Sequence, residues 1–179
     1  MCVIDSMHNL FLGTAKRVFT KWIESEILTK AGLETIQTRI NEMPSLSDIG
    51  RRPGNIKSSY GGYTAAQWKY FVLQYSMYCL KDVISDQHLR YWQSFARACH
   101  LLCKPSITKE DLIVADCKLL HFVKIMRKLM ANYQFLPTCI CTFTLKSSLK
   151  TTAVFMDFSC LALNDKVVFW VPITQTTRE

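Results

Sequence analysis

Hydrophobic and polar positions repeat with the period of an α-helix over most of the first 130 residues. In residues 6–29 the apolar side chains keep the i, i+3, i+4 spacing of one helix face, and charged side chains fall elsewhere. Gly32 interrupts the pattern, and a second, shorter helix is predicted from there to Pro44. The two predicted faces consist of Met7, Leu10, Phe11, Val18, Trp22 and Ile23, and of Leu33, Ile36, Ile40 and Met43.

Further amphipathic helices are predicted between residues 64 and 129. Thr64-x-x-Gln67 is a capping-box pattern that opens the next helix, and its aromatic residues favour core packing over base stacking. Another helix covers about 86–103, and Thr108-x-x-Asp111 caps the one after it. Their predicted core faces are Trp68, Phe71, Val72, Tyr75 and Cys79; Leu89, Trp92, Phe95, Ala96, Cys99 and Cys103; and Leu112, Ala115, Leu119, Phe122, Met126 and Leu129.

Residues 44–63 are predicted to be irregular, because six glycines and prolines punctuate them. Small residues permit close approach to a phosphate backbone and cations replace its counterions, so this loop suits nucleic acid. A solvated basic loop without a ligand is the alternative, and the absence of a groove-reading motif gives no reason to expect sequence-specific readout. The candidate nucleic-acid-binding residues are Arg51, Arg52 and Lys57 in this loop, with Lys16 and Arg17 on the first helix.

The helical pattern of hydrophobic and polar residues ends after about Leu129. Residues 138–145 alternate weakly like a strand, 152–163 form an unpatterned apolar run, and 166–173 have the composition of another strand. The predicted fold class is therefore mainly α, a bundle of about five helices with an irregular or weakly β tail. The predicted domains are residues 1–131 and a degenerate tail, 132–179.

Composition narrows the class of protein. Nearly half of the residues are hydrophobic and the net charge is +8, which is typical of a globular chain with a polyanionic partner. No apolar run reaches the ~18–20 residues of a membrane span, and no charged-then-apolar leader is present. The eight cysteines lie mostly in apolar helical contexts. A reduced, intracellular protein without a membrane or small-molecule partner is therefore expected.

Two cysteine-containing pairs have metal-ligand spacing. Cys99 and Cys103, and Cys117 and His121, are i, i+4 pairs on neighbouring predicted helices, and four such ligands would suit zinc if the helices faced each other. Because the pairs fall on or beside apolar faces, where cysteine behaves as a small hydrophobe, a core role is the competing interpretation.

Asp5 and His8 stand just ahead of the first apolar run. At i and i+3 they can share one face of a first helical turn, where a carboxylate and an imidazole can serve a metal ion or a phosphodiester. The same spacing fits a helix cap followed by an amphipathic helix in which His8 is merely hydrogen-bonded.

The stretch Asp-x-Met-His-Asn-Leu-Phe-Leu-Gly at 5–13 resembles the Asp-x-x-His block of the transposases of CACTA-like DNA elements. The similarity continues, in order and spacing, over roughly residues 2–130. It includes Pro-Ser-Leu-Ser-Asp-Ile-Gly-Arg-Arg-Pro at 44–53, Gly-Tyr-Thr-Ala-Ala-Gln-Trp-Lys at 62–69, Tyr-Cys-Leu-Lys-Asp at 78–82 and Trp-Gln-Ser-Phe at 92–95, then 98–99, 106–108 and 115–116. The resemblance implies the middle portion of an enzyme with an RNase H-like core and a DDE metal site.

Beyond residue 130 the resemblance continues only in another reading frame. The family pattern has Asn-Met-His-Leu-His-x-His-Leu-Lys and, later, Phe-Ser-Phe-Glu-Arg and Gly-Ile-Leu-Gly. A shifted triplet consists of the last base of one codon and the first two bases of the next. Across 137–146 and 155–176, such shifted triplets can encode these segments. At two junctions the shifted triplet is fixed by the amino acids. Met156 followed by Asp157 gives GGA, and Trp170 followed by Val171 gives GGT; both encode glycine, where the family has glycine. We therefore predict a frame change near Leu129–Leu136.

The frame change decides the predicted chemistry. In the family, three carboxylates hold two Mg²⁺ or Mn²⁺ ions that drive strand cleavage and transfer. The family glutamate would straddle the codons of Leu163 and Asn164, and the family's first carboxylates are expected ahead of this fragment. Asp5 and His8 would be a remnant of the catalytic site, too incomplete to bind a metal tightly.

The first hypothesis is therefore an inactive transposase fragment that is nuclear if expressed. Its expected partners are DNA and other transposase subunits in an oligomer. The alternatives are a non-catalytic basic helical module that binds nucleic acid or a transposase partner, and a small zinc-structured domain.

Overall fold

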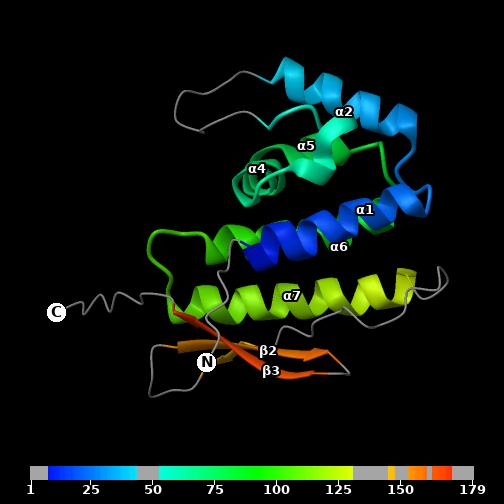
Figure 1. Ribbon diagram of the computed structural model, residues 1–179. Coiled ribbons are helices and arrows are strands. Elements are labelled where there is room, and N and C mark those ends of the chain that lie inside the picture. Colours follow the sequence, from blue (N-terminus) through cyan, green and yellow to red (C-terminus); the bar gives the residue numbers. More distant parts are fainter. Residues whose placement is uncertain (1–7, 44–52, 131–144, 148–152, 161–162, 171–179) are drawn as a thin grey trace. The chain divides into compact units, whose positions relative to one another are not determined.

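The computed structural model describes residues 8–43, 53–130, 145–147, 153–160 and 163–170. This part of the chain is mainly α-helical, as predicted, and helices occur in each of the five regions where the periodicity places them (Figure 1). In order the helical elements are π-helical η1 (His8–Ala15), α1 (Lys16–Glu24), α2 (Lys30–Glu42), α3 (Ile56–Ser59), the 3₁₀ turn η3 (Tyr60–Gly62), α4 (Ala65–Tyr70), π-helical η4 (Phe71–Tyr75), α5 (Ser76–Leu80), α6 (Asp86–Leu102) and α7 (Lys109–Met130).

The first helix ends earlier than predicted. Its continuous helical path, η1 followed by α1, stops at Glu24 rather than at residue 29. Glu26 has a φ of 56°, which no right-handed helix accommodates, and the Leu28 N–H donates to the Trp22 carbonyl at 2.9 Å. This turn buries Leu28, so tertiary packing overrides the helical periodicity of residues 25–29.

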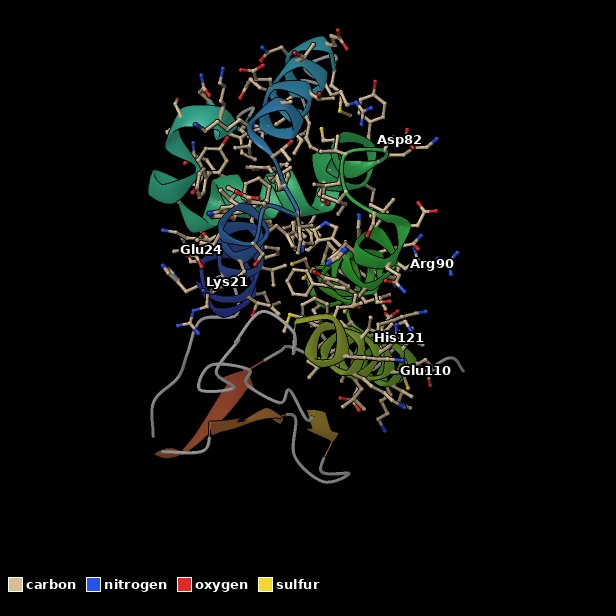
Figure 2. The ribbon with its side chains drawn as sticks, turned by 90° about the vertical axis from the view of Figure 1, so that its right-hand side faces the viewer. Lys21, Glu24, Asp82, Arg90, Glu110 and His121 are labelled. Carbon is tan, nitrogen blue, oxygen red and sulfur yellow. The ribbon has the colours of Figure 1, made fainter. Side chains whose placement is uncertain are left out.

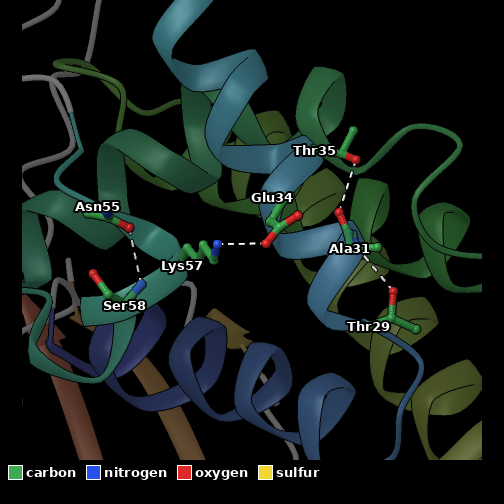
Figure 3. A network of polar contacts seen from close by, with 8 residues as sticks. Thr29, Ala31, Glu34, Thr35, Asn55, Lys57 and Ser58 are labelled. Atoms are coloured by element: carbon green, nitrogen blue, oxygen red, sulfur yellow. Dashed lines mark hydrogen bonds and ion pairs between the residues drawn. The ribbon is translucent and has the colours of Figure 1, made fainter.

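The segment predicted to be irregular contains short helices. Residues 44–52 lie outside the described part of the chain, but α3 and η3 occupy Ile56–Gly62. Asn55 caps α3, because its side-chain oxygen accepts from the Ser58 N–H at 3.1 Å (Figure 3). The Ile56 N–H donates to Gln37 of α2, and α2 contacts α3. The irregular prediction is wrong for this part, because a capping asparagine and a fully buried Ile56 stabilise a helix too short for periodicity to reveal.

Both predicted capping patterns are confirmed. The Thr64 hydroxyl accepts from the Gln67 N–H at 3.3 Å, and the Gln67 side chain accepts from the Thr64 N–H at 2.9 Å. The Thr108 hydroxyl accepts from the Asp111 N–H at 3.1 Å, and the Asp111 carboxylate accepts from the Thr108 N–H at 3.2 Å. Each reciprocal pair satisfies two backbone N–H groups that a helix start otherwise leaves without a partner.

The chain forms two compact units, Ser6–Gln93 and Met1–Asp5 with Ser94–Glu179, called here the N-terminal and C-terminal units. The core of the N-terminal unit is aromatic. Trp22 packs on Trp92 with ring centroids 5.1 Å apart and donates its indole N–H to the Tyr91 hydroxyl. Phe19 meets the edges of Trp68 and Phe71 at 5.4 and 5.6 Å. These rings bring α1, α4, η4 and the start of α6 together.

Helix α2 lies beside α5 in the N-terminal unit (Figure 1). Arg39 of α2 donates from Nη1 to the carbonyls of Tyr78 and Cys79, each at 3.1 Å, and to that of Lys81. Its guanidinium also lies over the Tyr78 ring, 5.7 Å from the centroid. Arg39 therefore satisfies the last carbonyls of α5, which have no intrahelical donor, with a charge that suits a helix C-terminus.

In the C-terminal unit, the end of α6 packs on α7. Phe95 and Phe122 have ring centroids 5.0 Å apart, and the Ser94 hydroxyl lies 2.9 Å from Nδ1 of His121. Lys104 forms an ion pair with Asp111 at 2.7 Å, next to the cap of α7. Aromatic packing on one side and polar contacts beside it fix the register of the two helices.

The tail contains three antiparallel strands in the order β1 (Leu145–Ser147), β2 (Ala153–Cys160) and β3 (Leu163–Trp170). Leu145 pairs with Met156, and Ala153 pairs with Trp170. A tail with β character was predicted, although β2 falls in a run that showed no alternation. The predicted domain boundary between residues 131 and 132 marks a change of sequence texture and lies inside the C-terminal unit, so it stays a prediction.

Candidate nucleic-acid interface

The Asp-x-x-His block is only partly described. His8 is the first residue of η1 and is exposed, whereas Asp5 lies outside the described residues. Within the described ranges, no group of three or more histidine, cysteine, aspartate or glutamate side chains is placed to hold a metal ion. The role predicted for Asp5 and His8 therefore stays a prediction.

One candidate cation of the first helix contacts the glycine-rich segment within the N-terminal unit. Lys16, the first residue of α1, donates from Nζ to the carbonyl of Gly61 in η3. Arg17 follows it and is exposed. Arg51 and Arg52 lie outside the described residues. The contact between Lys16 and Gly61 joins two regions that are 45 positions apart in the sequence, which sequence reasoning had only grouped by charge.

Lys57 has an acidic neighbour that the sequence did not reveal. Its Nζ lies 2.6 Å from Glu34 of α2 (Figure 3). The hydrogen bond and charge of Lys57 lower the pKa of Glu34 below its ordinary value. Both side chains are exposed, and exposed pairs of this kind contribute little to stability, so the pair can open when a phosphate competes for the ammonium group. Glu34 nevertheless offsets the local charge, which makes Lys57 a weaker phosphate ligand than its sequence context suggests.

The four residues of the zinc hypothesis do not form one cluster in the described structure. Cys99 is fully buried, whereas Cys117 is exposed. Burial raises the pKa of the Cys99 thiol well above its ordinary value, which disfavours the thiolate that a zinc site needs. His121 has a ring nitrogen beside Ser94. These observations favour the core role for Cys99 and give no support to the zinc-structured domain.

Sequence reasoning missed the residues that attach elements distant in the sequence. Arg39 stood among the polar residues of α2, and nothing in its spacing points to carbonyls some 40 residues away. The π-helical segments were also missed, because a 3.6-residue periodicity describes α-helices only. In η4 the wider turn is followed by Ser76, whose hydroxyl donates to the Val72 carbonyl at 2.8 Å. The sequence shows only a serine inside an aromatic run, and its burial is known from the structure.

The chain was compared with protein-family models, curated proteins and solved structures. No family model matches the chain, and no curated protein or solved structure matches it. Among the described residues, no helix is both long enough and apolar enough to cross a membrane.

Proposed function

We propose that this chain is a fragment of a CACTA-like DNA transposase, consisting of the Asp-x-x-His block and a helical insertion, and that it does not cleave DNA by itself. The observation that carries the proposal is the ordered series of motifs over roughly residues 2–130, which ends where the sequence texture changes. A helical body at 8–43 and 53–130 agrees with an insertion of this kind.

The described residues include no cluster that would make a two-metal centre. Such a centre needs several carboxylates converging on two ions about 3.5–4 Å apart. The described residues hold no group of three or more metal-ligating side chains, and His8 is exposed at the start of η1. The glutamate that completes the family's site is replaced by the Leu163–Asn164 junction. No catalytic step is therefore assigned to this chain.

The nucleotide sequence of the gene tests the proposed origin. The last base of the Leu163 codon and the first two bases of the Asn164 codon are expected to give GAA, which encodes glutamate. The junctions across 137–146 should spell the histidine-rich segment in the same frame. A gene whose hybrid codons encode neither segment would remove the argument for a frame-shifted transposase.

A second candidate function, non-specific nucleic-acid binding, is favoured by one structural observation. The contact of Lys16 with Gly61 brings a basic helix start to the glycine-rich segment. Exposed Arg17 adjoins it, and the chain carries a net charge of +8. Phosphate neutralisation by such cations releases counterions and requires no base contacts.

Salt dependence of duplex-DNA binding tests this second function. The double variant Arg51→Ala, Arg52→Ala is expected to bind more weakly and to reduce the slope of log K against log salt by about 0.9 for each phosphate that is no longer neutralised. The matched control is Lys104→Ala together with Arg97→Ala, which removes two charges from exposed positions of the C-terminal unit. Equal slopes for all three proteins would exclude Arg51 and Arg52 from the candidate interface.

A further inference from the structure

Helix α7 has two apolar faces. One is buried, and its members are Leu112, Ala115, Leu119, Phe122, Val123 and Met126. The other is exposed and is called here the outer stripe: Ile113, Val114, Cys117 and Leu120. The exposed fractions of Ile113, Val114 and Leu120 are 62%, 43% and 43%. At about 100° per residue the outer stripe lies on the side of the helix opposite the buried face.

Charged residues flank the outer stripe with opposite signs at its two ends. Glu110 precedes it in the first turn of α7 and is exposed. Lys124 and Lys128 follow it and are exposed as well. Figure 2 shows Glu110 and His121 projecting from the same side of α7. Lys109 and Lys118 are exposed too, but at about 100° per residue they lie about 80° and 100° to the two sides of Cys117, whereas Glu110 and Lys124 lie within about 20° of it. Along the middle of the outer stripe the order is therefore acidic, apolar and then basic.

We propose that the outer stripe is the contact surface for a second copy of this chain, with the two α7 helices antiparallel and related by a twofold axis at Cys117. Glu110 and Lys124 are each seven positions from Cys117, so each glutamate would face the lysine of the other copy. Val114 would likewise face Leu120. The twofold axis makes every contact occur twice, as in any isologous dimer.

The positions of the charges favour a second, antiparallel copy of α7 as the partner of the outer stripe. A parallel arrangement would place Glu110 against Glu110 and Lys124 against Lys124, which costs free energy instead of contributing it. A nucleic acid would be attracted by the lysines of α7 but would gain nothing from the isoleucine, valine and leucine side chains that form the outer stripe itself. The antiparallel arrangement also places each helix N-terminus beside the C-terminus of its partner, which the helix dipoles favour.

The contact is expected to be weak and to depend on concentration. From Glu110 to Lys124 the stripe spans about 21 Å at 1.5 Å per residue, so a single helix face is covered. Such a face buries less than the roughly 1,200 Å² typical of stable complexes. We therefore expect a dimer that dissociates on dilution.

Sedimentation velocity over a wide range of concentrations tests the surface. The chain is expected to dimerise, and the double variant Ile113→Ser, Leu120→Ser to raise the dimer dissociation constant by more than about tenfold. Because both side chains are exposed, circular dichroism should show an unchanged helical fold. A chain that stays monomeric throughout, or a dimer that the double variant leaves unchanged, would overturn the proposal.

A charge exchange tests the antiparallel orientation. Glu110→Lys alone and Lys124→Glu alone should each weaken the dimer about five- to tenfold, since each creates two like-charge pairs across the axis. The double variant Glu110→Lys, Lys124→Glu restores opposite charges and should restore the original dissociation constant. Failure of the double variant to recover would contradict the antiparallel arrangement, whatever the single variants do.

Cross-linking at Cys117 gives an independent geometric test. With helix axes 8–10 Å apart and Cα atoms about 2.3 Å from each axis, two facing Cys117 residues would have Cα atoms about 3.4–5.4 Å apart, a range whose upper half is within disulfide reach. In a chain with Cys2, Cys139, Cys141 and Cys160 changed to serine, diamide should accept the two electrons and two protons of the paired thiols and yield a covalent dimer. Cys117→Ser in the same background should abolish it. A cross-link that persists without Cys117, or one that never forms, would overturn the proposed axis.

Discussion

Replacing Trp22 with alanine is expected to lower the free energy of unfolding by about 3–5 kcal/mol, the range for a fully buried aromatic side chain. The Trp22 side chain has no exposed area and contacts the rings of Phe19, Tyr91 and Trp92. Its loss also leaves the buried Tyr91 hydroxyl without the indole donor. Urea unfolding followed by circular dichroism measures the effect.

Two milder variants separate packing from hydrogen bonding at this position. Trp22→Phe keeps part of the ring volume, and Tyr91→Phe removes only the hydroxyl that accepts from Trp22, at a cost of about 1–3 kcal/mol. We expect both variants to be more stable than Trp22→Ala. If Trp22→Ala lost less than about 1 kcal/mol, the aromatic core of the N-terminal unit would not be packed as described.

Replacing Arg39 with methionine is expected to cost about 2 kcal/mol. Its guanidinium donates to the carbonyls of Tyr78, Cys79 and Lys81, and hydrogen bonds that involve a charged group contribute about 1.5–3 kcal/mol. Partial exposure of Arg39 places the expected loss near the lower end of that range. Methionine retains the aliphatic packing, so the loss reports on the polar contacts. Thermal and urea unfolding both measure it.

Two control variants test whether the loss of stability comes from the contacts of Arg39 with the α5 carbonyls. Arg39→Lys keeps the charge but lacks the planar fork that reaches several carbonyls, so an intermediate loss is expected. Arg97→Met changes an exposed position of α6 and should stay within about 0.5 kcal/mol of the unmodified chain. If Arg39→Met resembled Arg97→Met, then Arg39 would not hold the end of α5 against α2.

The helices were predictable because periodicity and capping are local properties of the sequence. Thr64 with Gln67 and Thr108 with Asp111 fix two helix starts through contacts three residues apart, which any reader of the sequence can find. The turn at Glu26 was not predictable, because its cause is the burial of Leu28 in a tertiary core. Short α3 was hidden for the same reason, since burial of Ile56 stabilises it rather than any repeat.

The candidate site was less predictable than the fold. Charge counting found Lys16 and Lys57, but their partners, the Gly61 carbonyl and Glu34, lie 45 and 23 positions away. Such pairings depend on how helices pack, which composition does not encode. The sequence placed Ile113 and Leu120 outside the predicted core face of α7, but only the structure shows that these two side chains are exposed.

The central claim is that this chain retains part of a transposase without a working metal site. Supercoiled plasmid incubated with the purified chain and Mg²⁺ or Mn²⁺ gives the most direct test, with Asp5→Asn as the matched variant. We predict no metal-dependent nicking or strand joining above buffer for either protein. Nicking or joining that requires the metal ion and disappears in the Asp5→Asn variant would contradict the claim.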